Sequence, residues 1–442
     1  MQRLAPALCF ALLTTPVLAA PSIAHGPMLG HVGPSEAHLW LRISGEAEAR
    51  LVYGKQPELS PQKHSTTIRL TPENHLMGKL SLENLESQQR YFYAIELDGK
   101  RVTEKPYPSF TTAPPAGKPA RQRIAFSSCL GRTGDATAAA WGQMEKTSRA
   151  DLILLLGDNH YADTTAREGQ STAYFSHRSP AAFRTISSRT PTYAIWDDHD
   201  YGPNDSDGTA AGKEESLATF KDFWPNPGFG EADNPGIYYK FSRGEVDFFM
   251  LDDRYHRSPD RMIDDGHKTM LGARQLAWLK RELSAATGKV KIIASGSEWQ
   301  PNSHADSWTS YPRERSQIFR FIEEEGIEGV LLISGDRHFT GGYQIGGQLI
   351  EVTAGPLGSK NFPTKNLPDM FLNCGEGKLF AVFDIDTTGA EPQIMLEVHR
   401  AGEGVIKEMA LPWKAILGEQ QLPTLPVQTT PKKAPFQLPF RG

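Results

Sequence analysis

The chain has 442 residues, of which 39% are hydrophobic and 22% are charged, as in an ordinary soluble globular protein. This length allows two domains. The net charge of −5 gives no overall positive field of the kind that favours DNA or RNA, so composition argues against nucleic-acid binding through a basic surface.

The first twenty residues resemble a secretory signal peptide. Arg3 supplies a positive start, an apolar run extends over residues 5–18, and Ala19-Ala20 completes a cleavage site of small residues. No second arginine adjoins Arg3, which favours the general secretory route. No later segment approaches about 18 uninterrupted apolar residues. We therefore expect residues 1–20 to be a signal peptide, and the mature protein to be periplasmic or secreted without a transmembrane segment.

Residues 21–113 are predicted to form an all-β domain. Alternating apolar and polar residues occupy 37–42, 49–53 and 91–97, and Asp98-Gly99 after the third run is a hairpin signal. Short strands separated by turns favour a β-sandwich of the immunoglobulin or fibronectin type.

A linker rich in proline and glycine, residues 111–119, leads to a second domain over residues 120–413. Helical patterns occur in this domain at 272–283 and 313–325. Six apolar runs, some of them separated by these helical patterns, lead directly into small or ionisable residues: 124–126, 152–156, 193–196, 246–251, 290–294 and 330–333. This alternation predicts a layered α/β domain with a buried sheet, whose ligands bind beyond the carboxyl ends of the strands.

Residues 414–442 are rich in proline, contain a basic Lys432-Lys433 pair and show little periodicity. We expect a tail that is disordered or lies on the surface.

The segment Gly157–Asp163 follows one of the apolar runs and carries residues suited to phosphoryl chemistry with two metal ions. Such chemistry needs a bridging carboxylate, further hard ligands and an acid for the leaving group. Asp158 comes straight after the predicted strand, and the phenol of Tyr161 lies three positions later. A tyrosinate ligand suits a hard trivalent ion such as ferric iron.

Two more strand ends carry the same kinds of residue. Residues 197–200 supply carboxylates and the imidazole of His199, and Asp336 and His338 are two apart, so both side chains can point the same way from an extended turn. Each motif alone is also typical of an ordinary turn or solvated loop. Their recurrence at strand ends of one domain favours a shared metal site.

The chain resembles the PhoD-like (alkaline phosphatase D) family of calcineurin-like metallophosphoesterases from about Gly26 to Val398. The motifs that carry this resemblance are GPMLG at residues 26–30, Ser128-Cys129, GDNHYAD, IWDDHDYGPND, LDDRYHR, MLGARQLAWLKREL, DSWTSYPRER and ISGDRH. The resemblance implies a β-sandwich-like N-terminal domain followed by an αββα metallophosphoesterase domain.

The resemblance also implies two or more metal ions. One set of side chains would hold ferric iron: Cys129 as a thiolate, Asp158, Tyr161 and His338. A second ion, Ca²⁺ or another divalent ion, would be held by Asp158 as a bridge, with Asp198 and Asp336.

The same resemblance gives roles to residues around the metals. His199 would protonate the leaving group, with Asp197 and Asp200 orienting the site. Asn204 is an additional candidate as a ligand or a phosphate contact.

For Arg254 two readings stay open. The guanidinium would hold a phosphate oxygen, or it would form an interior salt bridge with Asp252 or Asp253.

Three features qualify the match to the family. His160 stands where an apolar residue is commoner, and either lines the pocket or packs as a hydrogen-bonded histidine. The segment 295–299 lacks the usual histidine of the fourth metallophosphoesterase motif, which favours harder ions over zinc. Cys129 would be lost as a ligand if it paired with Cys374 in an oxidising compartment.

The function that these observations favour is an exported phosphoesterase that hydrolyses phosphate monoesters, diesters or both, by a metal-bound hydroxide. An alternative is a phosphodiesterase or phospholipase-type enzyme acting on lipid, cell-wall polymer or nucleotide diesters. Less favoured are a non-catalytic exported binding protein and a metal-dependent esterase or lactonase. His304, Asp306 and Trp308 either shape the substrate pocket or, for the last two, begin a helix.

Overall fold

The computed structural model describes residues 19–362 and 364–427. The predicted signal peptide lies, apart from its last two residues, outside this part of the chain, and so does the Lys432-Lys433 pair. Among the described residues, no helix combines the length and the apolar character that crossing a membrane requires.

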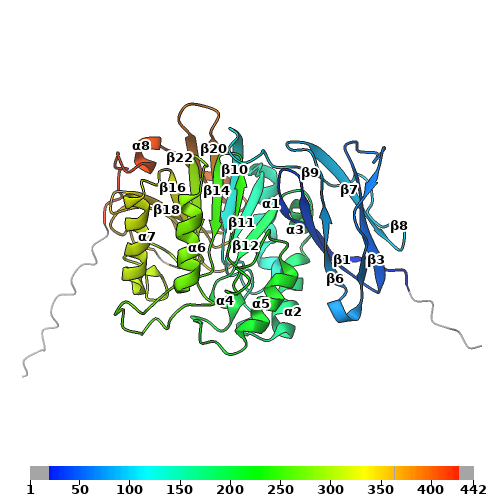
Figure 1. Ribbon diagram of the computed structural model, residues 1–442, viewed down its shortest axis with the longest axis horizontal. Coiled ribbons are helices and arrows are strands. Elements are labelled where there is room, and N and C mark those ends of the chain that lie inside the picture. The colour runs from blue at the N-terminus through cyan, green and yellow to red at the C-terminus, as the bar shows by residue number, and fades with distance from the viewer. Residues whose placement is uncertain (1–18, 363, 428–442) are drawn as a thin grey trace, which may run out of the picture.

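Two antiparallel sheets form the N-terminal part of the chain, drawn in blue in Figure 1. The first contains β1 (Ile23–Val32), β2 (Ala37–Ile43) and β6 (Met77–Leu82). The second contains β3 (Ala47–Gly54), β4 (Lys63–His64), β5 (Ile68–Leu70), β7 (Arg90–Leu97), β8 (Lys100–Arg101) and β9 (Ser109–Thr111). Their facing apolar side chains form one hydrophobic cluster.

The three strands predicted in this region are confirmed as β2, β3 and β7. The predicted hairpin is also present, since Leu97 pairs with Lys100 across Asp98 and Gly99. Both turn residues have positive φ, 47° and 74°, as a tight turn that follows the strand twist requires.

Two mixed sheets make up the rest of the fold. One has the order β12-β11-β10-β20-β21-β22, with β10 (Arg121–Ser127), β11 (Leu152–Leu156), β12 (Thr192–Ile195), β20 (Leu379–Asp386), β21 (Gln393–Arg400) and β22 (Gly404–Leu411). The other has the order β13-β14-β15-β16-β18-β17-β19, with β13 (Tyr239–Arg243), β14 (Val246–Met250), β15 (Val290–Ala294), β16 (Val330–Ser334), β17 (Thr340–Ile345), β18 (Leu349–Thr353) and β19 (Met370–Cys374).

The six apolar runs predicted from the sequence are the strands β10, β11, β12, β14, β15 and β16. Within each sheet they pair in parallel, so their carboxyl ends lie at one edge. Side chains of both sheets, such as Phe126, Phe248 and Ile333, meet in one buried cluster between the sheets. Burial on both faces explains why these strands have continuous apolar sequences.

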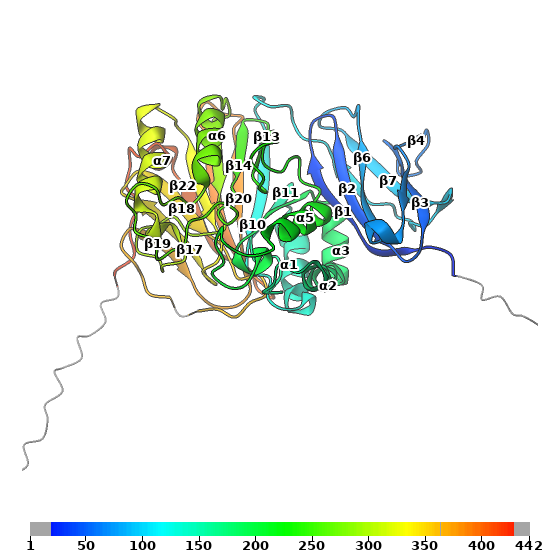
Figure 2. The ribbon, with the colours of Figure 1, turned by 60° about the horizontal axis from the view of Figure 1, so that its bottom comes forward.

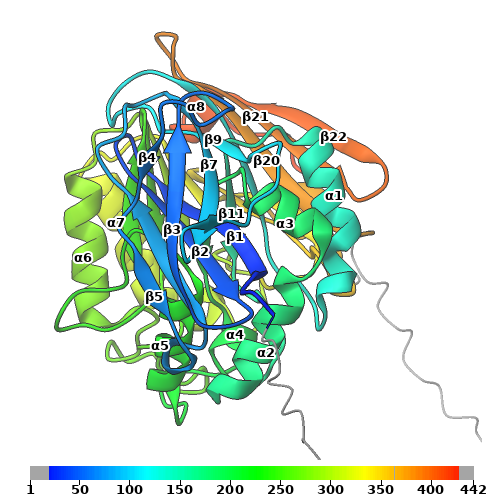
Figure 3. The same cartoon turned by 90° about the vertical axis from the view of Figure 1, so that its right-hand side faces the viewer.

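Helices cover the outer faces of the sheets (Figures 1 and 3). On the side of β14–β19 lie α6 (Gly272–Ser284) and α7 (Pro312–Glu324), which agree with the predicted helices to within one residue. On the side of β10–β12 lie α1 (Ala138–Thr147) and α3 (Ala181–Ser187), while α2 (Arg167–Arg178) and α5 (Lys213–Phe223) pack on each other below the strands in Figure 1. The short α4 (Asp198–Tyr201) begins at the end of β12, and α8 (Trp413–Ile416) follows β22.

The N-terminal sheets contact the layered part through α2 and α3, beside which they lie in Figure 2. At this contact the guanidinium of Arg178 is buried, and within residues 19–362 and 364–427 no carboxylate lies within ion-pair distance of it. Its Nη2 donates to the Phe223 carbonyl at 2.7 Å. It lies 4.0–5.4 Å from the centres of four aromatic rings: Trp40, Tyr174, Phe223 and Trp224. Stacking on these rings offsets the cost of burying the charge, since a cation is attracted to aromatic faces.

As far as it is described, the chain after α8 runs along the sheet that contains β17 and β19. The amide of Leu422 donates to Gln344 Oε1 at 2.7 Å, and the amide of Leu425 donates to the Met370 carbonyl at 2.7 Å. This part of the predicted tail therefore lies on the surface of the domain.

Candidate metal centre

The carboxyl ends of β10, β11, β12 and β16 bring most of the predicted site residues together. Four groups have ligand atoms within 4.8 Å of one another: Cys129 with Asp158 and His338, Asp158 with Asp198 and His199, Asp197 with Asp198 and Asp336, and Asp198 with Asp205 and Asp306. The first two groups share Asp158 and the last three share Asp198. The groups therefore form one continuous cluster, to which both sheets contribute.

Tyr161 lies in the first group. Its hydroxyl donates to Asp158 Oδ2 at 2.8 Å and lies 2.9 Å from His338 Nε2. The other ring nitrogen of His338, Nδ1, donates a hydrogen bond to the carbonyl of Lys360 at 2.7 Å. A backbone acceptor on Nδ1 fixes the tautomer and leaves Nε2 free as a ligand, as is typical of metal-binding histidines.

The backbone is strained at four of the predicted ligands. Cys129, Asp158, Asp336 and His338 have φ values of 57°, 53°, 66° and 54°. Few residues other than glycine adopt this left-handed region, and each instance costs of the order of 1 kcal/mol or more. Such strain concentrated at strand ends is typical of a functional site.

Two glycines allow the strand ends to meet so closely. A Cβ on Gly157 would lie 2.5 Å from the Cβ of Asp197, and one on Gly335 would lie 2.5 Å from the Leu156 carbonyl and 2.7 Å from Ser128 Cβ. Gly335 thus brings β16 of one sheet against the ends of β10 and β11 in the other. Any side chain here would push the ligands apart.

The electrostatics of the cluster fit a cation. Asp158 is 1% exposed and its Oδ1 has no hydrogen-bond partner among the described residues. Burial raises the pKa of Asp158 well above its usual value, and the charges of Asp198, Asp200 and Asp336 raise it further. Burial and the nearby carboxylates likewise raise the pKa of the Cys129 thiol. A bound cation would supply the missing partner and favour the ionised forms of both groups.

His199 contacts this cluster from its open side. Its Nδ1 forms a short ion pair with Asp163, and its ring lies 4.0 Å from that of Tyr161. Asp163 is also 3.4 Å from Arg132 Nη2. The sequence reading gave Asp163 no role, although it belongs to the same loop as Asp158 and Tyr161, and its proximity to His199 depends on how that loop folds back.

Asp200 organises the loops instead of facing the cluster. Its Oδ1 accepts from the Asp197 amide at 2.7 Å, and its Oδ2 accepts from the Asn159 amide at 3.1 Å. Burial raises the pKa of Asp200 to about 7, partly offset by these hydrogen bonds. The geometry agrees with the orienting role expected of it.

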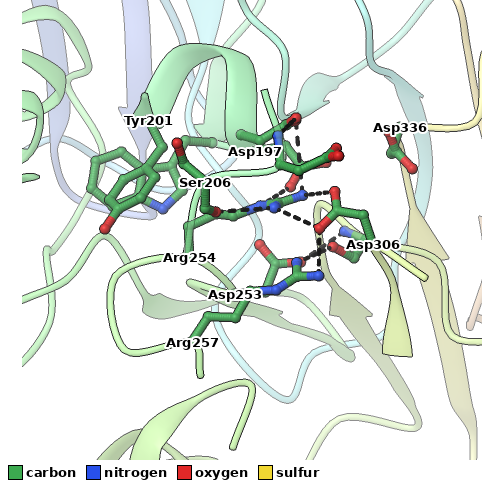
Figure 4. Close-up of polar contacts among 12 residues, drawn as sticks. Asp197, Tyr201, Ser206, Asp253, Arg254, Arg257, Asp306 and Asp336 are labelled. Carbon is green, nitrogen blue, oxygen red and sulfur yellow. Dashed lines mark hydrogen bonds and ion pairs between the residues drawn. The ribbon is translucent and has the colours of Figure 1, made fainter. Parts of the chain in front are cut away.

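Arg254 is fully buried in a set of carboxylates (Figure 4). Its Nε donates to Asp197 Oδ1 at 2.5 Å, and its two terminal nitrogens donate to the Asp306 carboxylate at 2.9 and 2.8 Å. Of the two readings of Arg254, this geometry favours the interior salt bridge, but with partners other than those expected. The backbone amide of Arg254 donates to Asp252 Oδ1, at 3.1 Å, and the guanidinium does not pair with Asp252.

Asp306, which the sequence predicts either to shape the substrate pocket or to begin a helix, belongs to the same set of buried ion pairs. Besides Arg254 it pairs with Arg257 at 2.5 Å. Burial raises the pKa of its carboxyl, but the two guanidinium groups outweigh burial and hold the pKa below its usual value.

Asn204 and His304 are two further positions singled out from the sequence. Asn204 is exposed, and the next residue, Asp205, belongs to the group with Asp198 and Asp306 and donates its amide to Asp198 Oδ2 at 2.7 Å. His304 lies 2.8 Å from Asp336 Oδ2 through its Nε2.

His160 and Cys374 lie outside the cluster. The His160 ring is fully buried against that of Tyr174 at 4.3 Å, and its Nδ1 accepts from the Ala162 amide at 3.3 Å, so it packs as a core residue. Cys129 and Cys374 are both free, so the alternative in which they form a disulfide is wrong.

Two mixed sheets between helices, with a thiol, a phenol, imidazoles and carboxylates at their strand ends, define an α/β sandwich of the metallophosphoesterase type. A family model described as PhoD-like phosphatase matches residues 124–378, more than half of the chain, and the protein belongs to this family. A second model, a domain of unknown function (DUF7800), matches residues 20–115.

Individual relatives agree with this assignment. Alkaline phosphatase D of Bacillus subtilis (strain 168) is 23% identical over 308 residues, which cover 58% of this chain and 52% of the relative. The chain thus matches about half the length of that curated protein.

Solved structures show the same fold. A structure of PhoD matches with a TM-score of 0.72 at 16% identity, covering 89% of this chain and 93% of that one. A purple acid phosphatase, PPD1 from yellow lupin (Lupinus luteus) seeds, matches with a TM-score of 0.66 at 14% identity, covering 93% and 78%.

Proposed function

We propose that this protein is an exported, metal-dependent phosphoesterase that hydrolyses phosphate monoesters, diesters or both. The observation that carries the proposal is the position of Asp158, a buried carboxylate shared by two adjoining groups of potential ligands. One carboxylate between two such groups is the arrangement that a bridged pair of metal ions requires.

The side chains available to each ion differ in kind. One ion would be held by Cys129, Asp158, Tyr161 and His338. The other would be held by Asp158, Asp198 and Asp336. A phenolate beside a thiolate suits ferric iron, and a set composed of carboxylates suits Ca²⁺ or another hard divalent ion. When bound, these ions supply an acidified water and neutralise charge on the phosphate.

His199 is proposed as the acid that protonates the leaving oxygen. Its Nδ1 is engaged by Asp163, which leaves Nε2 as the atom that donates the proton. Asp163 therefore acts through His199 by fixing its orientation. Arg254 is proposed to hold Asp197 and Asp306 in place rather than to contact the phosphate.

The remaining parts of the chain fit an exported enzyme. We propose that residues 1–20 direct export to the periplasm or medium, that residues 21–113 form a sandwich domain of the immunoglobulin or fibronectin type, and that residues 120–413 form the catalytic domain. Asn204 would then lie at the rim of the site, where it could reach a bound phosphate.

Variants of the metal-loaded protein test the activity. Asp158→Asn should lower turnover of p-nitrophenyl phosphate by at least about a thousandfold, because it removes the shared ligand. Asp233→Asn, which changes an exposed aspartate, is the matched control and should behave as wild type. Hydrolysis of p-nitrophenyl acetate but of no phosphate ester would overturn the proposal, and bis(p-nitrophenyl) phosphate separates diesterase from monoesterase activity.

The role of His199 is tested with leaving groups of different basicity. His199→Ala should slow hydrolysis of an alkyl phosphate by about a hundredfold, and that of p-nitrophenyl phosphate far less, because p-nitrophenolate leaves without a proton. Asp163→Asn should show the same pattern more weakly. Equal losses on both substrates would rule out the acid role.

A further inference from the structure

An exposed aromatic ring lies directly beside the candidate metal centre. The ring of Phe362 stacks on that of His338, with centroids 4.5 Å apart and an angle of 4° between the planes. Phe362 is nevertheless 57% exposed, and it is the one aromatic residue among the exposed large hydrophobic residues of the described chain. More than half of the surface of Phe362 is therefore open to another molecule beside the candidate metal centre.

Orientation of His338 does not by itself require this ring. The Nδ1 of His338 is already fixed by the Lys360 carbonyl at 2.7 Å, and the His338 carbonyl accepts from Asn361 Nδ2 at 3.4 Å. Two polar contacts from the adjoining residues thus position the histidine, and Phe362 adds an apolar surface to them.

The position of the ring relative to the ligand atom indicates what could contact it. The Nε2 atom of His338 lies in the plane of the imidazole and is 2.9 Å from Tyr161 Oη, inside the cluster. Phe362 stacks on the face of that imidazole, so its ring lies one side chain away from the candidate metal centre. Most other side chains on the open side, including Tyr161, His199, Asp336 and Arg337, are partly exposed and carry polar atoms.

We propose that Phe362 is a specificity-determining residue whose ring stacks on a flat aromatic group of the substrate. This inference rests on the proposed function and narrows it: the preferred esters are those of aryl alcohols or of alcohols that carry an aromatic base. The exposed ring of Phe362, stacked on His338, would contact the organic group of an ester whose phosphate is held at the metal centre. Face-to-face or offset contact with that ring rewards a planar group and gives nothing to a small alkyl group.

Direct binding of two phosphonates separates this contribution from the metal centre. Phenylphosphonate and methylphosphonate present the same anionic head and are not hydrolysed, so their affinities for the metal-loaded protein can be measured by calorimetry. We expect Phe362→Ala to weaken the binding of phenylphosphonate by about fivefold to tenfold, since one stacking contact is lost. The affinity for methylphosphonate should not change. Phe362→Tyr should retain the wild-type ratio of the two affinities. Val405→Ala removes an exposed apolar side chain from β22 and serves as control.

Each outcome decides the proposal. If Phe362→Ala weakens the binding of both phosphonates by the same factor, Phe362 acts through His338. If it changes neither affinity, the ring makes no substrate contact. Either result overturns the inference and leaves the proposed function standing. If neither phosphonate binds to the metal-loaded wild-type protein, the proposed function itself fails, and this inference fails with it.

Discussion

At the scale of single residues, the buried charges around Arg254 hold together loops that are far apart in the sequence. Asp197 follows β12 and Asp306 lies beyond β15, and both pair with a guanidinium that is 0% exposed. A charge buried in this way is stable only while its partners remain, because desolvation is repaid by the ion pairs. Asp197 in turn lies next to Asp198 and Asp336 in the candidate centre.

Replacing Arg254 should therefore be costly. We expect Arg254→Met to lower the free energy of unfolding by about 3–5 kcal/mol, because the buried Asp197 carboxylate loses its counter-charge and Asp306 keeps only Arg257. Urea unfolding followed by circular dichroism measures the loss. Arg281→Met is the control, since Arg281 is 56% exposed and its pair with Glu231 is screened by water, so its removal should cost less than about 1 kcal/mol. Equal costs for the two variants would contradict this account.

At the scale of elements, the sequence predicts those strands and helices whose apolar residues form a continuous run or a clear period. Strands and helices with a weaker pattern cannot be predicted in this way. The six buried parallel strands are continuous apolar runs, and α6 and α7 have a clear helical period. By contrast, β22 is an edge strand in which half of the residues are exposed and Lys407-Glu408 interrupts the apolar residues, so the sequence does not show a clear alternation there. The helix α2 was missed because its buried residues include polar ones.

Two of those buried polar residues of α2 are His177 and Arg178, which lie near the contact with the N-terminal sheets. The Nε2 atom of His177 lies 2.9 Å from the Gly131 carbonyl, to which it donates. Burial lowers the pKa of His177 from 6.5 to about 4. The folded protein therefore holds this ring in its neutral form, while the unfolded chain takes up a proton near pH 6.5.

This difference predicts a loss of stability in acid. As the pH falls from about 6.5 towards 4, the unfolded state binds a proton that the folded state does not, so the free energy of unfolding decreases. For His177 alone the decrease at pH 5 is at most about 2 kcal/mol. Urea unfolding at pH 7.5 and pH 5 measures it, and His177→Gln, which retains a donor to Gly131, should reduce the decrease by that amount. The same decrease in both proteins would refute the assignment to His177.

At the scale of the whole molecule, the candidate centre forms where two sheets meet, and this limits what a sequence can predict. The placement of Cys129, Asp158, Asp198, Asp336 and His338 directly after buried strands is sufficient to bring them to a common edge. Pairings such as Asp163 with His199, or Arg254 with Asp306, depend on how long loops fold over that edge. No local pattern encodes that closure, so those pairings became visible only in the structure.

The central claim is that this edge binds two metal ions, one of them ferric iron held by Tyr161. The measurement that tests it most directly is elemental analysis of the purified mature protein together with its visible absorption spectrum. We predict two metal ions per chain, including iron, and a tyrosinate-to-iron band that Tyr161→Phe removes. A wild-type protein without stoichiometric metal, or a band that persists in Tyr161→Phe, would contradict the account.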